Sequence, residues 1–326
     1  MNGAGEAGAV ADSHVKDPVA SAAVVLDFNV QAIEAVTLDG PSALMARDLM
    51  SPYIWREDGV DGGLARWGIM VRAVTRAGEP MTDTGVIWAG WSDDGRHFAM
   101  LDAPSIVPGP GEHDAGGVED PTVLRRDDGS YLVYYTGVLA DHAHGELSYA
   151  SGASLDRLEK SGVVLASSKS EGNTKEATVE QTPDGRWRLF YEYAADEASR
   201  VGLAIGVDAV GPWQEQPTPF MPREGSWDDW HLSTGPLLLD QPDRPVMFYN
   251  GATRDARWRI GWIAFDRDCT RVLARGLEPL VTPPPAADRG ATDIAFAASV
   301  VVENGAIWLY YSLEDRRLVR ARIRRS

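Results

Sequence analysis

The sequence has one cysteine, Cys269, in 326 residues, which excludes an intrachain disulfide and a zinc site built from cysteines. It has no run near the ~20 apolar residues that a membrane span needs, and no signal-peptide pattern at its start. Basic residues are also few, with 31 Lys and Arg against 48 Asp and Glu, a net charge of −17. A surface this acidic repels nucleic-acid phosphates and anionic lipids, so we expect neither partner. The expected compartment is the cytoplasm.

The sequence also lacks the common catalytic motifs. It contains no nucleophile elbow G-x-S-x-G, no H-E-x-x-H metal motif and no phosphate-binding loop, so we expect no metal and no cofactor. Aromatic residues, by contrast, are abundant, with 11 Trp, 10 Tyr and 7 Phe. Acidic and aromatic side chains together suit the binding of a sugar, so an oligosaccharide or glycoside is the partner we expect, with a homo-oligomer also possible.

One pattern recurs five times along the chain: an aromatic-rich apolar run followed by a turn and a second apolar run. Such runs favour half-buried strands. The first runs span residues 67–74, 131–138, 187–194, 245–252 and 307–314. Aligning them places five residues at one position, about 60 residues apart: Val71, Tyr135, Tyr191, Tyr249 and Tyr311.

A second set of equivalent positions lies 14 to 20 residues before the first. It begins with Ser51, Asp120, Glu176, Gly235 and Ala297. A repeat of this length with three or four short strands is typical of a propeller blade. The sequence therefore predicts an all-β fold, a five-bladed β-propeller over residues 21–326 preceded by a flexible tail at 1–20. A β-sandwich or a pair of β domains is the alternative.

Two carboxylates, Asp120 and Glu176, occupy the same aligned position in the second and third repeats. The first strand of each blade lines the central channel, so Asp120 and Glu176 are expected to meet at its mouth although 56 residues separate them. Glycosidic cleavage needs two carboxyl groups, an acid for the leaving oxygen and a base or nucleophile. The alternative is that both are solvated loop ends, because Asp-Pro also opens turns.

Other residues are candidates for the same site. Asp48 precedes the first blade, Glu119 adjoins Asp120, and Glu180 follows Glu176 by four positions. Adjacent acids raise each other's pKa, which favours a proton donor at neutral pH. The segment 226–231, SWDDWH, offers a sugar platform that includes Trp230 and His231, or else packs its tryptophans against a blade.

These motifs together resemble glycoside hydrolase family 130. The resemblance covers about residues 45–326 and is carried by Gly117–Pro121 with the strand 131–136, by 70–73 and 91–98, and by Lys175–Ala177. Trp227 with His231–Pro236, and Tyr310–Tyr311 with Asp315, extend it to the last two repeats. The propeller families 43 and 32 are related, and an acidic triad of Asp48, Asp120 and Glu176 would suit a furanosidase of that kind.

The resemblance implies cleavage of β-mannosides with inversion, by water or by phosphate. It implies that Asp120 donates the proton and that Arg72 and Asp315 help to hold the sugar. Two positions depart from the phosphorolytic pattern as we read it, because neutral Thr122 and Asn250 replace an arginine and a histidine. Phosphate needs cationic donors, so the loss favours water, although Lys175 remains.

The main functional prediction is therefore an inverting, exo-acting hydrolase of β-mannosides with Glu176 as the base and Glu180 as the second choice. Such a pair should stand ~6.5–9.5 Å apart to leave room for water. A mannoside phosphorylase, a furanosidase and a non-catalytic sugar-binding propeller are the alternatives.

Overall fold

The computed structural model describes residues 26–57, 65–171, 173–284 and 293–326. The predicted tail at 1–20 lies outside these ranges. Within them the regular secondary structure is almost entirely β; the helices are α1 (Ser42–Met45) and the 3₁₀ helix η2 (Glu112–Asp114). None of the helices in the described ranges is long and apolar enough to cross a membrane.

The strands follow the predicted repeats. The first three repeats form three sheets, with pairing orders β2-β6-β5-β4-β3, β10-β9-β8-β7 and β11-β12-β13-β14. The first sheet comprises β2 (Thr37–Asp39), β3 (Asp48–Glu57), β4 (Arg66–Val74), β5 (Val86–Ser92) and β6 (His97–Met100). The second comprises β7 (Gly117–Arg125), β8 (Tyr131–Val138), β9 (Gly145–Gly152) and β10 (Glu159–Leu165). The third comprises β11 (Thr174–Gln181), β12 (Trp187–Ala195), β13 (Ala198–Gly206) and β14 (Trp213–Glu215).

The fourth repeat has interrupted strands, which the pairing divides into the sheets β15-β18-β19 and β16-β17-β20-β21. Backbone hydrogen bonds from Phe248 to Pro236 (3.0 Å) and from Gly261 to Tyr249 (2.9 Å) bridge the two sheets. We therefore treat them as one blade. Its strands are β15 (His231–Ser233), β16 (Leu237–Leu238), β17 (Val246–Met247), β18 (Asn250–Ala252), β19 (Trp258–Ile260), β20 (Ile263–Phe265) and β21 (Val272–Arg275).

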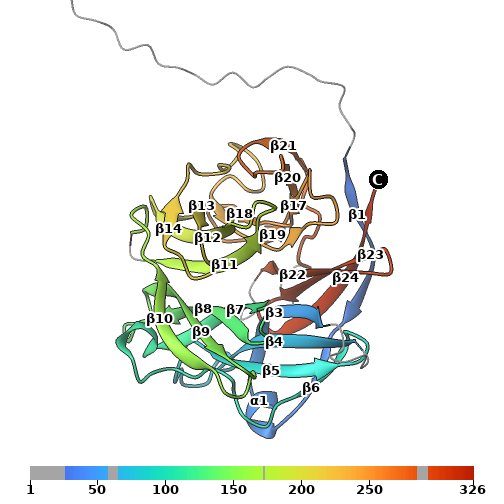
Figure 1. The fold of residues 1–326 in the computed structure, drawn as a ribbon. Coiled ribbons are helices and arrows are strands. Elements are labelled where there is room, and N and C mark those ends of the chain that lie inside the picture. Colours follow the sequence, from blue (N-terminus) through green and yellow to red (C-terminus); the bar gives the residue numbers. More distant parts are fainter. Residues whose placement is uncertain (1–25, 58–64, 172, 285–292) are drawn as a thin grey trace, which may run out of the picture.

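The last sheet joins the two ends of the described chain. It has the order β1-β24-β23-β22, with β1 (Phe28–Ala35), β22 (Ala295–Glu303), β23 (Ala306–Leu313) and β24 (Arg317–Arg325). The blue β1 lies along the red β24 in Figure 1, and the two pair antiparallel from Phe28 opposite Arg325 to Ala35 opposite Val319. The N-terminal strand thus completes the C-terminal sheet, a closure that the sequence patterns did not predict.

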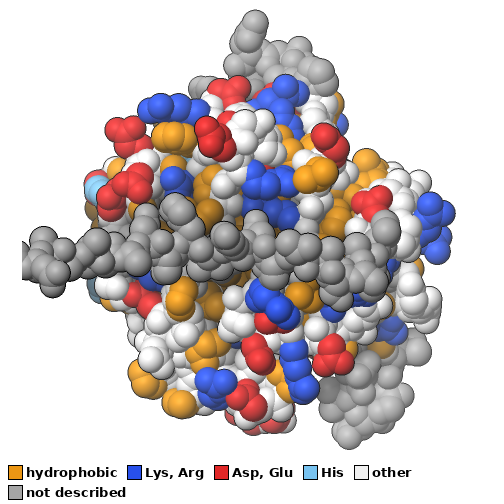
Figure 2. All heavy atoms as spheres, turned by 90° about the horizontal axis from the view of Figure 1, so that it is seen from above, with side chains coloured by type: hydrophobic (Ala, Val, Ile, Leu, Met, Phe, Trp, Pro, Cys, Tyr) orange, Lys and Arg blue, Asp and Glu red, His pale blue; other side chains and the backbone are white. Residues whose placement is uncertain are grey.

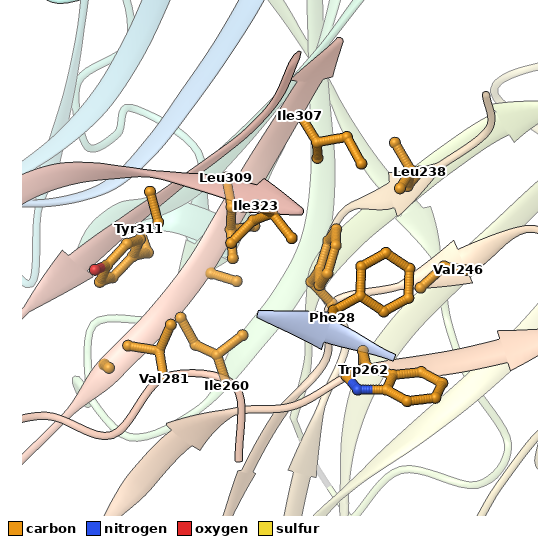
Figure 3. Close-up of a cluster of buried hydrophobic side chains, with 14 of the residues drawn as sticks. Phe28, Leu238, Val246, Ile260, Trp262, Val281, Ile307, Leu309, Tyr311 and Ile323 are labelled. Carbon is orange, nitrogen blue, oxygen red and sulfur yellow. The ribbon is translucent and has the colours of Figure 1, made fainter. Parts of the chain in front are cut away.

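The described residues form five hydrophobic clusters. Four of them lie between successive repeats, and one lies between the last repeat and the first, which closes the circle. Each contains one of the aligned residues: Tyr311, Val71, Tyr191, Tyr135 and Tyr249. Figure 3 shows the cluster between the fourth and fifth repeats, where Phe28 of β1 lies beside Trp262 with ring centroids 5.3 Å apart. The predicted alignment therefore corresponds to equivalent places in the core.

A cycle of hydrogen bonds joins each repeat to the next around the axis. Its five members are Ser51 Oγ to Asp120 Oδ1 (2.6 Å), Thr122 Oγ1 to Ala177 O (2.7 Å), Thr178 Oγ1 to Gly235 O (2.9 Å), Asn250 Nδ2 to Ala297 O (3.2 Å) and Ser299 Oγ to Pro52 O (2.9 Å). The strand pairing, the hydrophobic clusters and this cycle of hydrogen bonds are typical of an all-β propeller built from five repeats.

Candidate active site

The first strands share an irregularity at the aligned acidic positions. In β7, Asp120 and Pro121 together lie opposite one residue, Tyr135, and in β11 Glu176 and Ala177 lie opposite Tyr191. Such β-bulges re-aim a side chain and are frequent next to active sites. The φ angles of Asp120 and Glu176 are +50° and +54°, in the left-handed region that non-glycine residues rarely adopt. Strain of this kind, roughly 1–3 kcal/mol per residue, clusters at functional sites.

The two bulges bring Asp120 and Glu176 into contact. Both line a small cavity of about 20 Å³ at the axis, together with Ser51 of the equivalent bulge in β3. The pKa of Glu176 is raised well above its usual value, first by burial, then by the negative charge of Asp120, and further by a hydrogen bond with the Asp120 carboxyl. The raised pKa favours a protonated Glu176, which can share its proton with the neighbouring Asp120 carboxyl.

This contact corrects the expected spacing. An inverting acid and base need ~6.5–9.5 Å between them, and a retaining pair ~5–5.5 Å, but carboxyls in hydrogen-bond contact leave no room for water or a sugar carbon. The reason is that identical bulges in adjacent blades aim both side chains at the same point. Asp120 and Glu176 are consequently hydrogen-bonded neighbours in this structure, rather than two groups set apart across a gap.

Arg72 of β4 supports this pair. Its Nη2 donates to Glu119 Oε1 at 2.5 Å and to the Thr84 carbonyl at 2.8 Å, and its Nη1 lies 3.5 Å from Asp120 Oδ1. Asp315, which follows β23, also interacts with this cluster. Its pKa is raised to about 6, mainly by burial and further by the charge of Asp120, while the charge of Arg72 lowers it. Arg72 is therefore fully engaged by the carboxylates and the carbonyl around it.

Lys175 and His231 belong to a second chain of contacts beside the pair. Lys175 Nζ lies 3.6 Å from Glu192 Oε1, and the Glu192 charge raises the pKa of Lys175. Ser199 links the two predicted residues, since its hydroxyl donates to Glu192 at 2.8 Å and its backbone N–H donates to His231 Nδ1 at 3.2 Å. Burial lowers the pKa of His231, so this ring is neutral and adds no cation.

Trp230 lines a broad, open pocket of about 800 Å³ next to His231. The Arg254 guanidinium lies over its ring, 4.4 Å from the centroid, and Arg200 donates to its carbonyl at 2.7 Å. Trp227 of the same predicted platform is instead stacked on Tyr249, with centroids 5.6 Å apart. Only Trp230 of these two tryptophans is thus placed to meet a ligand in that pocket.

Thr122 and Asn250, the two neutral residues that replace phosphate-binding side chains in our prediction, form hydrogen bonds within the protein. Thr122 is buried and belongs to the cycle around the axis, through its bond to Ala177. Asn250 is fully buried; it donates to the carbonyls of Thr234 (2.8 Å) and Ala297 (3.2 Å) and accepts from the Ala297 N–H (2.7 Å). Both side chains therefore tie blades together.

Two predicted residues lie apart from the pair. Asp48 begins β3, three positions before Ser51, and the described part of the structure offers it no hydrogen bond or ion pair with Asp120 or Glu176. Glu180 lies two residues beyond Thr178 on β11 and lines a separate cavity of about 40 Å³ further along the axis. Glu180 does not line the cavity that Asp120 and Glu176 share.

Sequence reasoning missed two members of the site. Ser51 was recognised only as an aligned position, although the bulge gives it the same φ, +50°, and aims it at Asp120. Glu192 was not considered; it is the residue directly opposite Lys175 in the β11–β12 register. The signal was available, because Glu192 directly follows the aligned Tyr191.

The charges around the pair are predominantly negative. Five acids, Glu119, Asp120, Glu176, Glu192 and Asp315, are accompanied by two cations, Arg72 and Lys175, and each cation has a carboxylate within 4.0 Å. On the face seen from above in Figure 2, in contrast, basic and acidic side chains are interspersed. The site is therefore a poor host for a further dianion such as phosphate, and a better one for a neutral molecule rich in hydroxyls.

Comparison with known proteins identifies relatives of this chain. The family model for glycoside hydrolase family 130, described as beta-1,4-mannooligosaccharide phosphorylase, matches residues 74–325. The beta-1,2-mannobiose phosphorylase of Thermoanaerobacter sp. (strain X514) is 23% identical over 230 residues, which cover 70% of this chain and 73% of that protein.

Solved structures share the fold. A glycosyl hydrolase from Bacteroides ovatus superposes with a TM-score of 0.69 and 22% identity, covering 85% of this chain and 84% of that one. The beta-1,2-mannobiose phosphorylase from Listeria innocua, in complex with beta-1,2-mannobiose, gives a TM-score of 0.67 and 16% identity, with 90% of both chains covered. A third structure was reported with members of the family that are glycoside hydrolases targeting beta-1,2 mannosidic linkages in Candida mannan. It superposes with a TM-score of 0.69 and 21% identity, covering 85% of this chain and 84% of that one.

Proposed function

Because the chain belongs to glycoside hydrolase family 130, we propose that it hydrolyses β-mannosides and that the Asp120–Glu176 pair supplies the proton to the leaving oxygen. The observation that carries the proposal is the excess of carboxylates around the pair. The two cations nearby already have carboxylate partners, and Thr122 and Asn250 bond to backbone groups.

In the proposed reaction Asp120 touches the glycosidic oxygen. Transfer of the shared proton from Glu176 to Asp120 along their hydrogen bond produces the protonated Asp120 that the step requires. Asp120 then gives this proton to the leaving oxygen as the glycosidic bond breaks. Arg72 holds Asp120 and Glu119 in place, and the Glu119 carboxylate can accept hydrogen bonds from sugar hydroxyls.

Hydrolysis also needs a carboxylate that takes a proton from the attacking water. Glu176 is a poor choice in this geometry, because it contacts Asp120 and carries the proton. Asp315 is a half-buried carboxyl that is not hydrogen-bonded to Asp120, and its pKa of about 6 leaves it mostly ionised at pH 7. We therefore assign water activation to Asp315. Lys175, Trp230 and His231 complete the proposed substrate-binding surface.

A phosphorylase is the second candidate, favoured by the names of the family model and of two relatives. Release of mannose from β-1,2- and β-1,4-mannobiose, measured with and without inorganic phosphate, separates the two. Hydrolysis predicts free mannose without phosphate and no increase when phosphate is added. Mannose 1-phosphate formed in proportion to added phosphate would overturn the proposal. NMR of the first product reports whether the configuration inverts.

Two glutamates on one strand provide a matched test of the proton-sharing pair. Glu176→Gln and Asp120→Asn should each lower kcat by about 10²–10⁴-fold, the usual contribution of general acid catalysis. Glu180→Gln should leave kcat within about two-fold, since Glu180 lies four residues away on β11 and does not line the cavity of the pair. Equal losses in Glu176→Gln and Glu180→Gln, with both variants folded, would contradict the assignment.

A further inference from the structure

A further cavity, remote from the carboxylate pair, lies between the third and fourth repeats. Its volume is about 240 Å³, and its lining includes Arg188, Leu203, Ile205, Pro219 and Cys269. Arg188 lies opposite Glu180 at the far end of β11, four residues beyond Glu176, or roughly 13 Å at the rise of an extended strand. The cavity is thus separate from the proposed active site.

The notable member of the lining is Arg188. Its residue is only 4% exposed, and its Nε has no hydrogen-bond partner. Of the five N–H donors of the guanidinium, the described residues satisfy one, with a bond of 3.3 Å from Nη2 to the carbonyl of Arg267. No carboxylate of the described chain lies within 4.0 Å of it, whereas Arg72 has carboxylates at 2.5 Å and 3.5 Å.

A buried charge without a partner is costly, by several kcal/mol per ion. The facing Glu180 relieves this cost only in part: the two groups attract, but burial raises the pKa of Glu180 to about 7, so roughly half of it is protonated at neutral pH. Asp184 at the rim already accepts from Arg186 Nε at 2.8 Å. Arg188 therefore lines this cavity with donors that the described residues leave unsatisfied.

We propose that this cavity binds a small organic carboxylate, whose two oxygens accept from the Arg188 guanidinium. The planar fork of an arginine matches a carboxylate in two parallel hydrogen bonds. Leu203, Ile205 and the prolines 217 and 219 offer an apolar surface for a short hydrocarbon body. A water takes about 30 Å³ in the liquid, so the space accommodates one small acid rather than a sugar chain. Asp184 and Asp268 at the rim disfavour a dianion such as phosphate.

The chain provides its own reporter, because Cys269 lines the cavity and is the sole cysteine. The test measures the rate at which methyl methanethiosulfonate modifies Cys269 in the intact protein, by mass spectrometry, as propionate is titrated in at constant ionic strength. We expect propionate to slow the reaction at least five-fold with a saturable dependence. The neutral isostere propionamide and chloride should have no such effect, and phosphate a weaker one.

Two variants locate the effect. Arg188→Gln should abolish the saturable protection, whereas Arg186→Gln, which removes an exposed arginine at the rim, should retain it. A rate independent of propionate in the unmodified protein, or equal protection by propionamide, would show that the cavity holds only water and would overturn the proposal. This comparison of two ligands on the unmodified chain decides the matter even where Arg188→Gln fails to fold.

Discussion

Replacing Glu180 by glutamine tests whether the burial of this side chain carries the energetic cost that the structure implies. Glu180 lines the axial cavity of about 40 Å³, and its pKa rises from 4.5 to about 7, chiefly because burial disfavours the charged form; the charge of Arg188 opposes the rise. The native state then holds a proton that the unfolded chain has released between these two values. Stability due to this group is present below pH 4.5 and is lost as the pH rises to 7.

The magnitude follows from the size of the shift. Each pKa unit is worth about 1.4 kcal/mol, so the ionised glutamate lowers the free energy of unfolding by about 3 kcal/mol above pH 7. Glutamine has the same shape and does not titrate. We expect Glu180→Gln to gain about 2–3 kcal/mol over the unmodified protein on going from pH 5 to pH 8, whatever constant offset the amide introduces.

The assay is urea unfolding followed by tryptophan fluorescence at pH 5, 6, 7 and 8. Glu79→Gln, a change at an exposed glutamate, serves as the control and should run parallel to the unmodified protein at every pH. If the Glu180→Gln and unmodified curves also run parallel from pH 5 to 8, then burial does not raise the Glu180 pKa as argued.

Three further predictions concern closure, the axial contacts and the pH profile. Phe28→Ala should lower the free energy of unfolding by about 3–5 kcal/mol in urea, because this buried ring joins β1 to Phe248 and Trp262; a change under 1 kcal/mol would mean that β1 does not close the ring. Asn250→Ala should cost about 2–3 kcal/mol in the same assay, since it leaves the buried N–H of Ala297 without its acceptor, whereas an unchanged midpoint would refute that role. The kcat/KM of the unmodified enzyme should fall below pH 6 as Asp315 gains a proton. Asp315→Asn should have lower activity, and its kcat/KM should not show this fall at acidic pH. The same fall in the variant would assign it to another group.

The sequence alone determined the repeat and its consequences. Short aromatic runs recurring every ~60 residues can bury their faces only against neighbouring copies of themselves, so the fold class and the aligned core positions followed from periodicity. The same alignment identified Asp120 and Glu176 as neighbours at the axis. The closure by β1 escaped prediction because Phe28–Ala35 matches no repeat and finds its partner, β24, almost 300 residues away.

Only the tertiary structure decided how close the two acids come and what surrounds them. Side-chain aim depends on the backbone at the bulges, where a positive φ turns Asp120 and Glu176 towards each other, and no sequence pattern encodes that angle. It likewise decided that Thr122 and Asn250 bond across blades, and that Arg188 is buried without a carboxylate partner. The periodic pattern determines which residues share a level in the propeller, but charge, burial and contact arise from side chains that meet only after the ring has closed.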